Sequence, residues 1–540
     1  MKTDDGRVYV FLALFCFLLY GGTLSYSLSW LDDYFLLIEA KPFLSSLKNL
    51  PALFFTDAFI TSPIGLYRPL LNVSFMWDTL LNNLTGGWFF THLNNILLHI
   101  VSVCLFYRFL RIFSFKTKTA SVMMSIIFAA HPAASVAVGW IPGRNDLLLA
   151  VFAFSSFIIL DKYRENGEIR HIICYSVLLL LSLFTKESAV ALPFLGLFWL
   201  LICLFEEKKG FLLSLRQSGG SDFKADFNVF ALFSIIPLLF WALMRHLSYI
   251  GKTEIVVSAT LHNFLYLPEI IGHTLFPAWP VSVSPYQLLP NSMVSVVIFV
   301  VFFLFFAVFA VKMTRKFYLL WKNNVNLPEN SEKMEKKAKK NTENVDYSSV
   351  SLFFVIVFGI LWFLMLFIPT LAAGEGISSG SSFFEHRLYL PLAGFLLAIG
   401  IAANEIPERR KTFSFALSVV FLLFFSAVSF CHLGNYEDRY VFWQQAVQDS
   451  PEDFSNFVRA GQFEEQRGLD GQAEYFYIRA IEMNPAQSML HASLAGIYYR
   501  RGDYAAAEAA MQSELQISPD CQKCHDWLAA LRKQKLAIGN

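Results

Sequence analysis

Residues 350–371 read VSLFFVIVFGILWFLMLFIPTL, an apolar stretch without a charged side chain. A helix of about 20 such residues is long enough to cross ~30 Å of hydrocarbon. The whole chain of 540 residues is 55% hydrophobic and only 16% charged, whereas soluble domains carry roughly 25% charged residues. The composition therefore excludes a soluble globular enzyme and a disordered chain, and it indicates a protein that crosses the membrane several times.

Similar apolar stretches recur along the chain and predict an all-α fold. We expect a polytopic membrane helix bundle of about eleven spans over residues 1–431. The predicted spans are 8–28, 88–107, 120–140, 146–160, 171–185, 188–205, 227–247, 291–312, 350–371, 388–404 and 412–431. The formal net charge of +1 provides no overall basic field for nucleic acid, and seven cysteines are too few for a disulfide scaffold.

Lysine and arginine are concentrated in alternate loops, which predicts the orientation of the bundle. With the N-terminus in the cytoplasm, the cytoplasmic segments hold 25 of the 43 Lys and Arg residues, the opposite loops hold 8, and the chain after residue 431 holds 10. Within the cytoplasmic set, residues 322–349 are predicted as a charged, solvated loop. The chain after residue 431 is therefore expected outside the cytoplasm.

Two outer segments are expected to lie along the membrane surface. Residues 29–87, the first outer loop, combine amphipathic stretches with Pro51, Pro63 and Pro69, a pattern typical of interfacial helices. Residues 261–290 are moderately apolar but contain five prolines. We expect this second segment to be interfacial or re-entrant on the outer side.

Residues 432–540 are predicted as a separate domain with an internal period of 34 residues. Pro451, Pro485 and Pro519 follow this period, as do Gly468 and Gly502. Such a period, with small and large apolar residues at helical spacing, is typical of tetratricopeptide repeats, which are stacked helix–turn–helix units. The sequence therefore predicts a C-terminal α-solenoid, a fold that by itself indicates no chemistry.

Polar and charged side chains gather at the outer ends of the predicted spans. Ionisable groups at membrane depth are costly, so clusters on one side of the membrane favour a functional site. Each cluster also has a structural interpretation, as a helix N-cap, an ion pair, an interhelical hydrogen bond or a loop turn. The candidates are Asp32, Asp33, Arg68, His92, Asn95, His99, Arg144, Asp146, Lys186, Glu187, Glu385 and Arg387.

The order of these groups resembles the transmembrane and tetratricopeptide-repeat-containing O-mannosyltransferases and their bacterial relatives in the GT-C class of membrane glycosyltransferases. The likeness covers nearly the whole chain. Its motifs are DD at 32–33, YRPL at 67–70, HxxNxxxH at 92–99, GRNDLL at 143–148, KE at 186–187 and EHRLYLP at 385–391, followed by the repeats. The chain departs from the family in having about two and a half repeats, and in His386, which separates Glu385 from Arg387. These departures favour a bacterial member, with its repeats in the periplasm.

The resemblance implies transfer of a sugar, mannose or another hexose, from a polyprenyl-phosphate lipid to a protein hydroxyl on the outer side. Asp32 is then the expected general base, and Asp33 would orient it or share a divalent metal with it. The other candidates would bind the substrates, with the cations at the donor phosphate. The expected partners are the sugar lipid and a protein acceptor held by the repeats.

Three other classes of protein stay open. A non-enzymatic scaffold would use its repeats to recruit partners to the membrane, although an anchor needs far fewer spans. A flippase or transporter would carry ionisable residues near mid-membrane, between broken helices. A redox protein would use Cys521, Cys524 and His525, which match the C-x-x-C-H pattern of c-type haem attachment. A surface disulfide or two free thiols are the simpler interpretations of that pattern.

Overall fold

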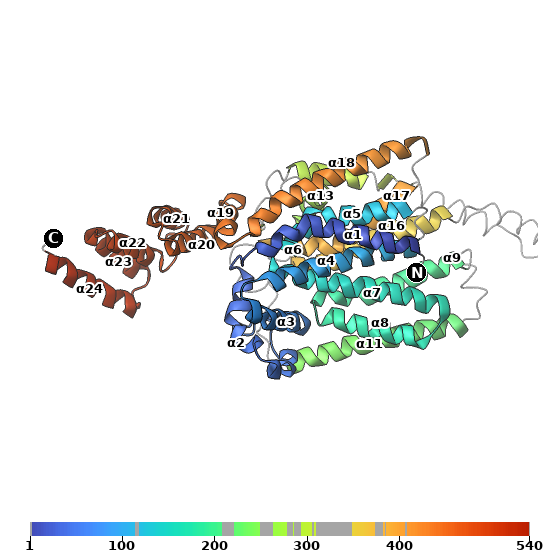
Figure 1. Ribbon diagram of the computed structural model, residues 1–540, viewed down its shortest axis with the longest axis horizontal. Coiled ribbons are helices and arrows are strands. Elements are labelled where there is room, and N and C mark those ends of the chain that lie inside the picture. The colour runs from blue at the N-terminus through green and yellow to red at the C-terminus, as the bar shows by residue number, and fades with distance from the viewer. Residues whose placement is uncertain are drawn as a thin grey trace, which may run out of the picture.

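The computed structural model shows a bundle of membrane helices from which a tail of shorter helices extends (Figure 1). It describes residues 3–113, 118–207, 221–248, 263–277, 284–285, 293–304, 307–308, 311, 348–372, 382–383, 385–404 and 408–538. Residues 322–347 of the predicted charged loop lie outside these ranges. The all-α prediction is confirmed, since the described strands are two residues each, β1 (Ser284–Pro285) antiparallel to β2 (Ser382–Phe383).

Eight helical segments among the described residues are long and apolar enough to cross a membrane. Their main helices are α1 (Thr3–Tyr20), α4 (Phe89–Leu110), α7 (Arg144–Asn166), α9 (Leu192–Glu207), α11 (Ser221–Leu247), α16 (Ser348–Phe367), α17 (Tyr389–Asn404) and α18 (Glu408–Leu433). The chain is therefore an integral membrane protein with several spans, as its composition predicted. Helix α8 (Ile169–Leu183) is apolar but shorter, so the eleven predicted segments include a helix below the length of an ordinary span. The described part of the predicted span 291–312 includes the apolar helix Met293–Leu304.

The predicted span 120–140 is a bent pair, α5 (Lys118–Ala130) and α6 (Pro132–Gly139), with 55° between the two axes. A proline inside a helix removes a backbone hydrogen bond and clashes with the preceding turn. The chain therefore breaks at His131, whose side chain accepts a hydrogen bond from the backbone N–H of Ala133 at 3.2 Å. With Pro132 at its first position, α6 begins a new direction toward the outer loop.

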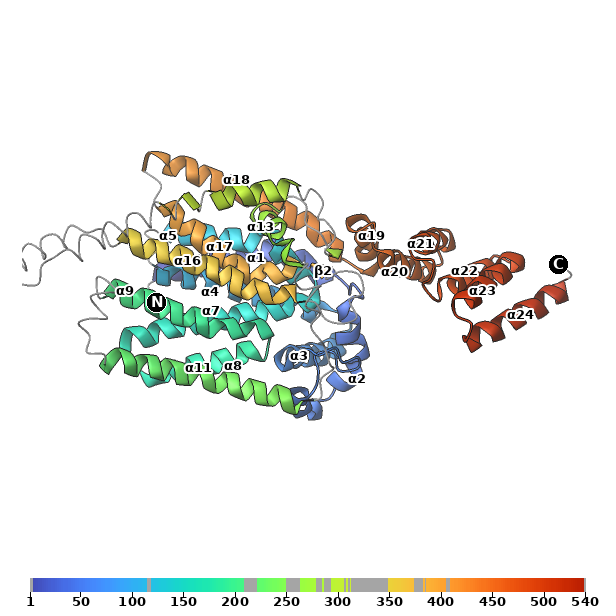
Figure 2. The ribbon, with the colours of Figure 1, turned by 180° about the vertical axis from the view of Figure 1, so that it is seen from behind.

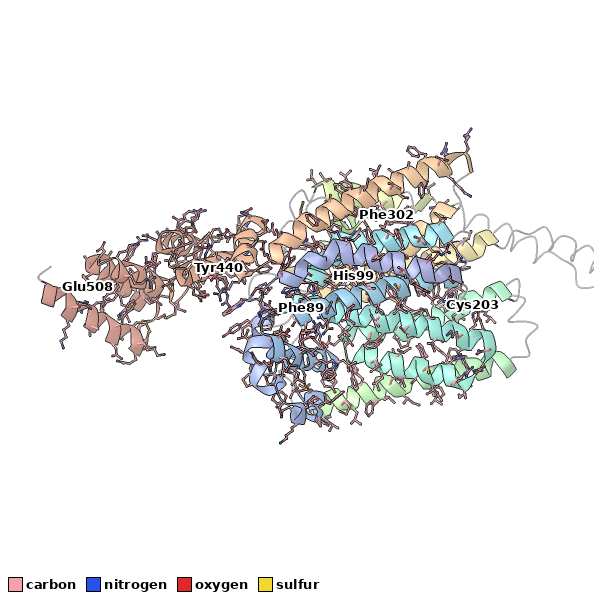
Figure 3. The ribbon with its side chains drawn as sticks, in the orientation of Figure 1. Phe89, His99, Cys203, Phe302, Tyr440 and Glu508 are labelled. Carbon is pink, nitrogen blue, oxygen red and sulfur yellow. A yellow bond between two sulfur atoms is a disulfide. The ribbon has the colours of Figure 1, made fainter. Side chains whose placement is uncertain are left out.

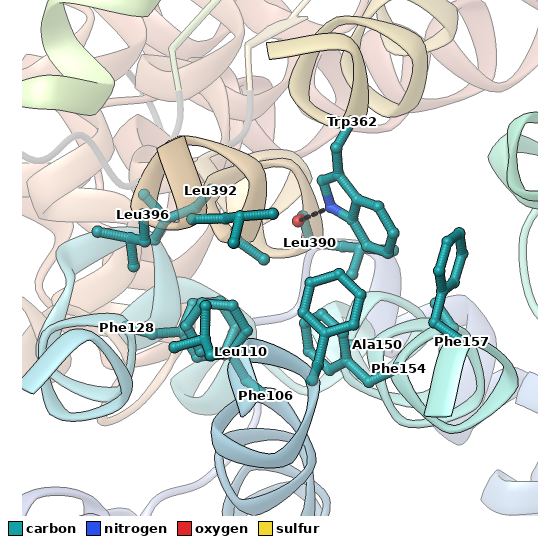
Figure 4. Close-up of a cluster of buried hydrophobic side chains, with 14 of the residues drawn as sticks. Phe106, Leu110, Phe128, Ala150, Phe154, Phe157, Trp362, Leu390, Leu392 and Leu396 are labelled. Atoms are coloured by element: carbon teal, nitrogen blue, oxygen red, sulfur yellow. Dashed lines mark hydrogen bonds between the residues drawn. The ribbon is translucent and has the colours of Figure 1, made fainter. Parts of the chain in front are cut away.

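The core of the bundle is built from aromatic and branched side chains around Trp362 (Figure 4). The Trp362 indole donates a hydrogen bond to the carbonyl of Leu390 at 2.9 Å, which joins α16 to α17. These two helices meet backbone to backbone, because a Cβ added to Gly359 or to Gly394 would overlap the other glycine's carbonyl oxygen. The start of α17, which directly follows the EHR motif in η9 (Glu385–Leu388), is thereby fixed against α16.

The predicted outer loop is folded rather than extended. It contains α2 (Lys41–Leu44) and α3 (Pro69–Thr85), which lie at the end of the bundle from which the tail extends (Figures 1 and 2). Helix α13 (Leu267–Leu275) belongs to the second predicted surface segment. Short helical turns complete the described chain: η1 (Gly21–Ser25), η2 (Tyr34–Glu39), η3 (Leu47–Asn49), η4 (Pro51–Phe55), η5 (Arg111–Phe113), η6 (Ile141–Gly143), η7 (Glu187–Ala191), η8 (Ile368–Leu371), η9 (Glu385–Leu388) and η10 (Gly434–Tyr436).

The tail is a series of helix pairs that is consistent with the predicted repeats. Its helices are α19 (Arg439–Asp449), α20 (Phe454–Gln466), α21 (Asp470–Met483), α22 (Leu490–Arg500), α23 (Tyr504–Ile517) and α24 (Gln522–Ile538). Helices α21 and α23 begin one 34-residue period apart. The turns before them use Gly468 and Gly502, at φ of +76° and +81°, a backbone region that favours glycine. The period therefore coincides with a repeated helix–turn–helix unit.

Candidate active site

A cavity of about 640 Å³ lies where the outer loop meets the ends of several membrane helices. Its charged lining comes from segments far apart in the sequence: the loop before η2, the start of α3, the turn between α8 and α9, the end of α11 and the turn η9 before α17. The charged and histidine side chains of the lining are Asp32, Arg68, Lys186, Glu187, Arg245, His386 and Arg387. Five of the twelve predicted site residues therefore line one cavity.

The two neighbouring aspartates have different surroundings. Asp33 is buried, and its carboxylate accepts hydrogen bonds from the backbone N–H of Ser29 at 2.7 Å and from the Ser29 hydroxyl at 3.1 Å. Asp32 is half-buried and lines the cavity. The geometry thus separates a carboxylate that closes the loop from one that faces the cavity.

Both aspartates have pKa values above the ordinary range of the residue. Burial raises the pKa of Asp32 to about 6, against the fields of Arg387 and Arg68, which lower it. Burial also raises the pKa of Asp33 to about 6, although the hydrogen bonds from Ser29 oppose the shift. A carboxylate with such a pKa accepts a proton near neutral pH more readily than an exposed aspartate does.

Arg68, Glu187 and Arg245 form a chain of ion pairs along one wall. The Arg68 guanidinium donates two hydrogen bonds to Oε2 of Glu187, at 3.2 and 3.0 Å. Arg245 Nη1 lies 3.8 Å from Oε1 of Glu187, and Arg245 Nη2 donates to the carbonyl of Gly65. One carboxylate is therefore shared by two guanidinium groups that both line the cavity.

Lys186 and Asp146 form a second ion pair beside the first. The Lys186 ammonium donates to both Asp146 carboxylate oxygens, at 2.7 and 2.8 Å. Nε2 of His386 lies 3.9 Å from the same carboxylate. Asp146 itself is behind the lining, while Lys186 and His386 reach the cavity. The GRND, KE and EHR motifs, which are distant in sequence, therefore meet at this point.

Arg387 and Glu385 point to different places although they are two residues apart. Arg387 lines the cavity, and its Nη1 donates to the carbonyl of Thr370 at 3.2 Å. Glu385 is buried outside the lining, with Oε1 2.8 Å from Nε2 of His273. Of the two candidates in this motif, only the arginine reaches the cavity.

Four candidates lie inside the bundle rather than in the cavity lining. Arg144 is fully buried and donates from Nε to Asn95 at 2.7 Å, from Nη2 to the carbonyl of Thr91 at 2.7 Å, and from Nη1 to Asp78. Nδ1 of His99, in the middle of the bundle (Figure 3), lies 2.8 Å from the Tyr389 hydroxyl.

The remaining member of this group, His92, contacts a backbone carbonyl through one ring nitrogen. Its Nε2 lies 3.3 Å from the carbonyl of Ser27, in the loop that leads to Asp32. The contacts of the HxxNxxxH face therefore match its structural interpretation, in which these side chains form hydrogen bonds between helices. It supports the site from behind and does not line it.

The sequence reasoning did not propose two charged or titratable residues of the lining. Arg245 was counted among the outer charges but was given no role, because no motif surrounds it at the end of α11. His386 was treated as a departure from the family pattern. The position of Arg245, at the outer end of the predicted span 227–247, was the signal that could have identified it.

Cys521 and Cys524 are joined by a disulfide at the start of α24. A surface disulfide was one of the interpretations given for the C-x-x-C-H pattern, beside haem attachment and two free thiols. His525 belongs to the same turn, and its Nε2 lies 2.8 Å from the carbonyl of Pro519. Attachment of haem would instead require both sulfur atoms for thioether bonds.

Sharing of a divalent metal by Asp32 and Asp33 stays a prediction. Within the described ranges, no three His, Cys, Asp or Glu side chains are close enough to hold a metal ion together. The Asp33 oxygens already accept hydrogen bonds from Ser29, whereas a divalent cation prefers several free oxygen ligands.

Comparison with known proteins finds relatives in animals, while no protein-family model matches the chain. The protein O-mannosyl-transferase Tmtc2 of Drosophila melanogaster is 33% identical over 157 residues, 27% of this chain and 15% of the relative. Tmtc1 of the same species is 27% identical over 234 residues, 41% of this chain and 27% of the relative. Human TMTC1 is 29% identical over 160 residues, 29% of this chain and 18% of the relative.

The aligned part spans about a quarter or less of the length of these relatives. Several members of one family match independently, and they are the family that the order of motifs resembles. Over these aligned parts the chain is therefore similar to the transmembrane and tetratricopeptide-repeat-containing O-mannosyltransferases.

Proposed function

We propose that the protein is a membrane glycosyltransferase that moves a hexose from a polyprenyl-phosphate donor to the hydroxyl group of a protein. The observation that carries the proposal is the joint lining of one cavity by Asp32 and four cations, Arg68, Lys186, Arg245 and Arg387. A carboxylate can accept the proton of the attacking hydroxyl, and cations can bind the phosphate that leaves. The relatives are named as protein O-mannosyl-transferases, which supports the same chemistry.

The charge balance of the described lining favours an anionic ligand. Its four cations face two carboxylates, Asp32 and Glu187, and Asp146 behind Lys186 adds a third negative charge. Guanidinium groups suit phosphate because they present several donors in one plane. We assign Arg387 and Arg68 to the phosphate, since these guanidinium groups, from the EHR and YRPL motifs, line the cavity together with Asp32.

An apolar cavity of about 480 Å³ supports a lipid donor. It follows α17 from Leu392 to Ala403 and is closed by side chains of α5, α13 and α18. Leu392 is five residues after Arg387, or ~7 Å along a helix axis at 1.5 Å per residue. A donor whose phosphate lies at Arg387 could therefore extend its polyprenyl chain along α17.

In the proposed reaction, Asp32 accepts the proton of the acceptor hydroxyl as its oxygen attacks the anomeric carbon. A bond forms between that oxygen and that carbon, and the bond from the carbon to the donor's phosphate oxygen breaks. The phosphate keeps the electron pair of the broken bond, and Arg387 and Arg68 stabilise its charge. Phosphate needs less protonation than an alkoxide leaving group, so one carboxylate suffices, unlike the carboxylate pair of glycosidases.

The other classes of protein have less support. A scaffold would not need a cavity lined by ion pairs inside the membrane domain. A transporter would carry such groups near mid-membrane, whereas the charged lining comes from loops and helix ends. A haem-bearing redox protein would use Cys521 and Cys524 for the cofactor, and these sulfur atoms are bonded to each other.

Replacement of Arg387 tests the assignment of the donor phosphate. We expect Arg387→Ala to raise the KM for a polyprenyl-phosphate [³H]mannose donor by about 10- to 100-fold, because a hydrogen bond to a charged group contributes about 1.5–3 kcal/mol. Transfer to a serine-rich peptide in detergent measures the change. Arg409→Ala, at an exposed position near the start of α18, is the matched control and should leave the KM unchanged. A KM that stays at the wild-type value in Arg387→Ala would remove Arg387 from the phosphate site.

We further propose that the N-terminus is cytoplasmic and that the cavity and repeats are extracytoplasmic. The asymmetry of 25 against 8 Lys and Arg residues supports this orientation. A reporter fused after residue 340 should then read as cytoplasmic, and one fused after residue 435 as extracytoplasmic. The same signal at both sites would contradict the orientation.

A further inference from the structure

We infer that the first two tail helices, α19 and α20, position the loop that carries Asp32, with Arg439 and Trp443 as the positioning residues. The consequence of this positioning for catalysis rests on the function proposed above. Figure 1 shows α19 and α20 as the tail helices nearest to the bundle, and Figure 3 places Tyr440 of α19 at this junction. The loop in question comprises residues 27–33.

Two hydrogen bonds join the loop backbone to the tail. The backbone N–H of Ser27 donates to the carbonyl of Glu437 at 2.8 Å. The indole N–H of Trp443 donates to the carbonyl of Ser29 at 3.0 Å, in a buried position. Ser29 in turn donates to Asp33 from its backbone N–H and its hydroxyl. The tail therefore contacts the same residue that orients the aspartate pair.

Trp30, between these contacts, has a backbone conformation that the loop alone would not favour. Its φ of +60° lies in the left-handed region, which is unfavourable for a bulky side chain. Such a conformation persists only where the surroundings determine it. The surroundings are supplied by the tail: the Arg439 guanidinium lies 4.3 Å from the Trp30 ring centre, and the Phe463 ring meets it edge-on at 5.8 Å.

A buried apolar cluster extends this contact to the cavity wall. It joins Trp443 and Phe463 of the tail to Val136 and Trp140 of the membrane domain. Trp140 also lines the cavity and lies 4.9 Å from the His386 ring. Tail and membrane domain thus share one packed core beside the site, so a shift of α19 would move the loop and the wall together.

The placement of Asp32 follows from these contacts. Asp32 follows Trp30 and Leu31 and precedes the buried Asp33. It is the aspartate of the pair that lines the cavity. Its neighbours on the N-terminal side are held by α19 and α20, and the neighbour on the C-terminal side is held by Ser29. A displacement of about 1 Å can reduce a reaction rate about 10²-fold. Contacts that hold the neighbours of Asp32 are therefore enough to control the rate.

Hydrogen–deuterium exchange of the full-length protein in detergent tests the positioning directly. We expect the backbone amides of residues 27–34 to exchange about 3- to 10-fold faster in Trp443→Phe. This substitution keeps an aromatic side chain but removes the indole N–H that donates to the carbonyl of Ser29. Arg439→Ala should have an effect at least as large. Arg459→Ala replaces an exposed arginine of α20 that does not contact the loop, and its exchange should match the wild type. Unchanged exchange of residues 27–34 in both Trp443→Phe and Arg439→Ala would overturn the inference.

Transfer of [³H]mannose from polyprenyl phosphate to a serine-rich peptide provides the second measurement. In Trp443→Phe we expect kcat to fall about 10-fold while the KM for the donor stays near the wild-type value. A purely structural role would instead reduce the folded fraction and leave the kcat of the folded protein unchanged, which would also overturn the inference. If exchange accelerates as expected but the wild-type protein transfers no sugar, the proposed function fails and the positioning of the loop stands.

Discussion

Asp32→Asn should lower sugar transfer by at least about 10²-fold while the protein stays folded and still binds the donor. A general base typically contributes about 10²–10⁴-fold to the rate, and asparagine has the shape of aspartate but cannot accept the proton. Asp32 is half-buried at the cavity, whereas Asp33 is the aspartate that accepts hydrogen bonds from Ser29 and holds the loop. The loss should therefore appear in kcat, measured with polyprenyl-phosphate [³H]mannose.

Two neighbouring variants separate the base from the loop. Glu39→Gln, at the end of η2, changes a carboxylate that accepts a hydrogen bond from Thr61 at 2.9 Å and is outside the cavity lining, so its transfer rate should match the wild type. Asp33→Asn should disturb the loop by weakening the hydrogen bonds from Ser29. If Asp32→Asn keeps most of its activity while Asp33→Asn loses it with the loop intact, Asp33 is the base. Activity in both variants would contradict the glycosyltransferase proposal.

The pH dependence of transfer follows from the same carboxylate. Burial raises the pKa of Asp32 to about 6, and a base acts only when deprotonated. Transfer should therefore be low below that pH and rise as the pH passes through about 6, to a plateau above it. Asp33 titrates in the same range, but it acts through the loop. The rise of transfer with pH should therefore disappear in Asp32→Asn and persist in Glu39→Gln.

The sequence could predict the membrane bundle and five of the charged residues that line the cavity, because both follow from strong local signals. Long apolar runs require helices, and charges at the outer ends of spans must gather at one end of a bundle. The short helix α8 was also predicted, as 171–185, but the bend at His131 was not, since a hydropathy pattern does not distinguish a straight span from a broken one. The pairing of Lys186 with Asp146 depends on how the helices pack, which no local sequence pattern indicates.

Position within a motif also does not tell which side chain faces the cavity. Arg144 and Asn145 are adjacent in the GRND motif, yet Asn145 lines the cavity and Arg144 points into the bundle. The difference arises because successive residues of a helix point about 100° apart, and α7 begins at Arg144. Which of the two faces inward is decided by the neighbours α3 and α4, whose placement only the folded structure reveals.

Arg144→Met should therefore destabilise the protein rather than weaken donor binding alone. Arg144 is fully buried against Asp78, which is also fully buried, and removing one partner of a buried ion pair typically costs about 3–5 kcal/mol because the other charge is left without compensation. Asn95 and the carbonyl of Thr91 would lose a donor as well. We expect a large fall in the unfolding midpoint, measured by denaturant titration in detergent with helical circular dichroism as the signal.

A second substitution and a matched control make the cause of this loss testable. Because an apolar pair of similar volume can replace a buried ion pair at little cost, Asp78→Leu combined with Arg144→Met should recover at least part of the lost stability. Arg164→Met, at the other end of the same helix, removes a partly exposed arginine paired with Asp161 at 2.9 Å and should cost no more than about 1 kcal/mol. A phosphate-binding role for Arg144, as its motif suggested, predicts the opposite result: an unchanged unfolding midpoint in Arg144→Met together with loss of donor binding.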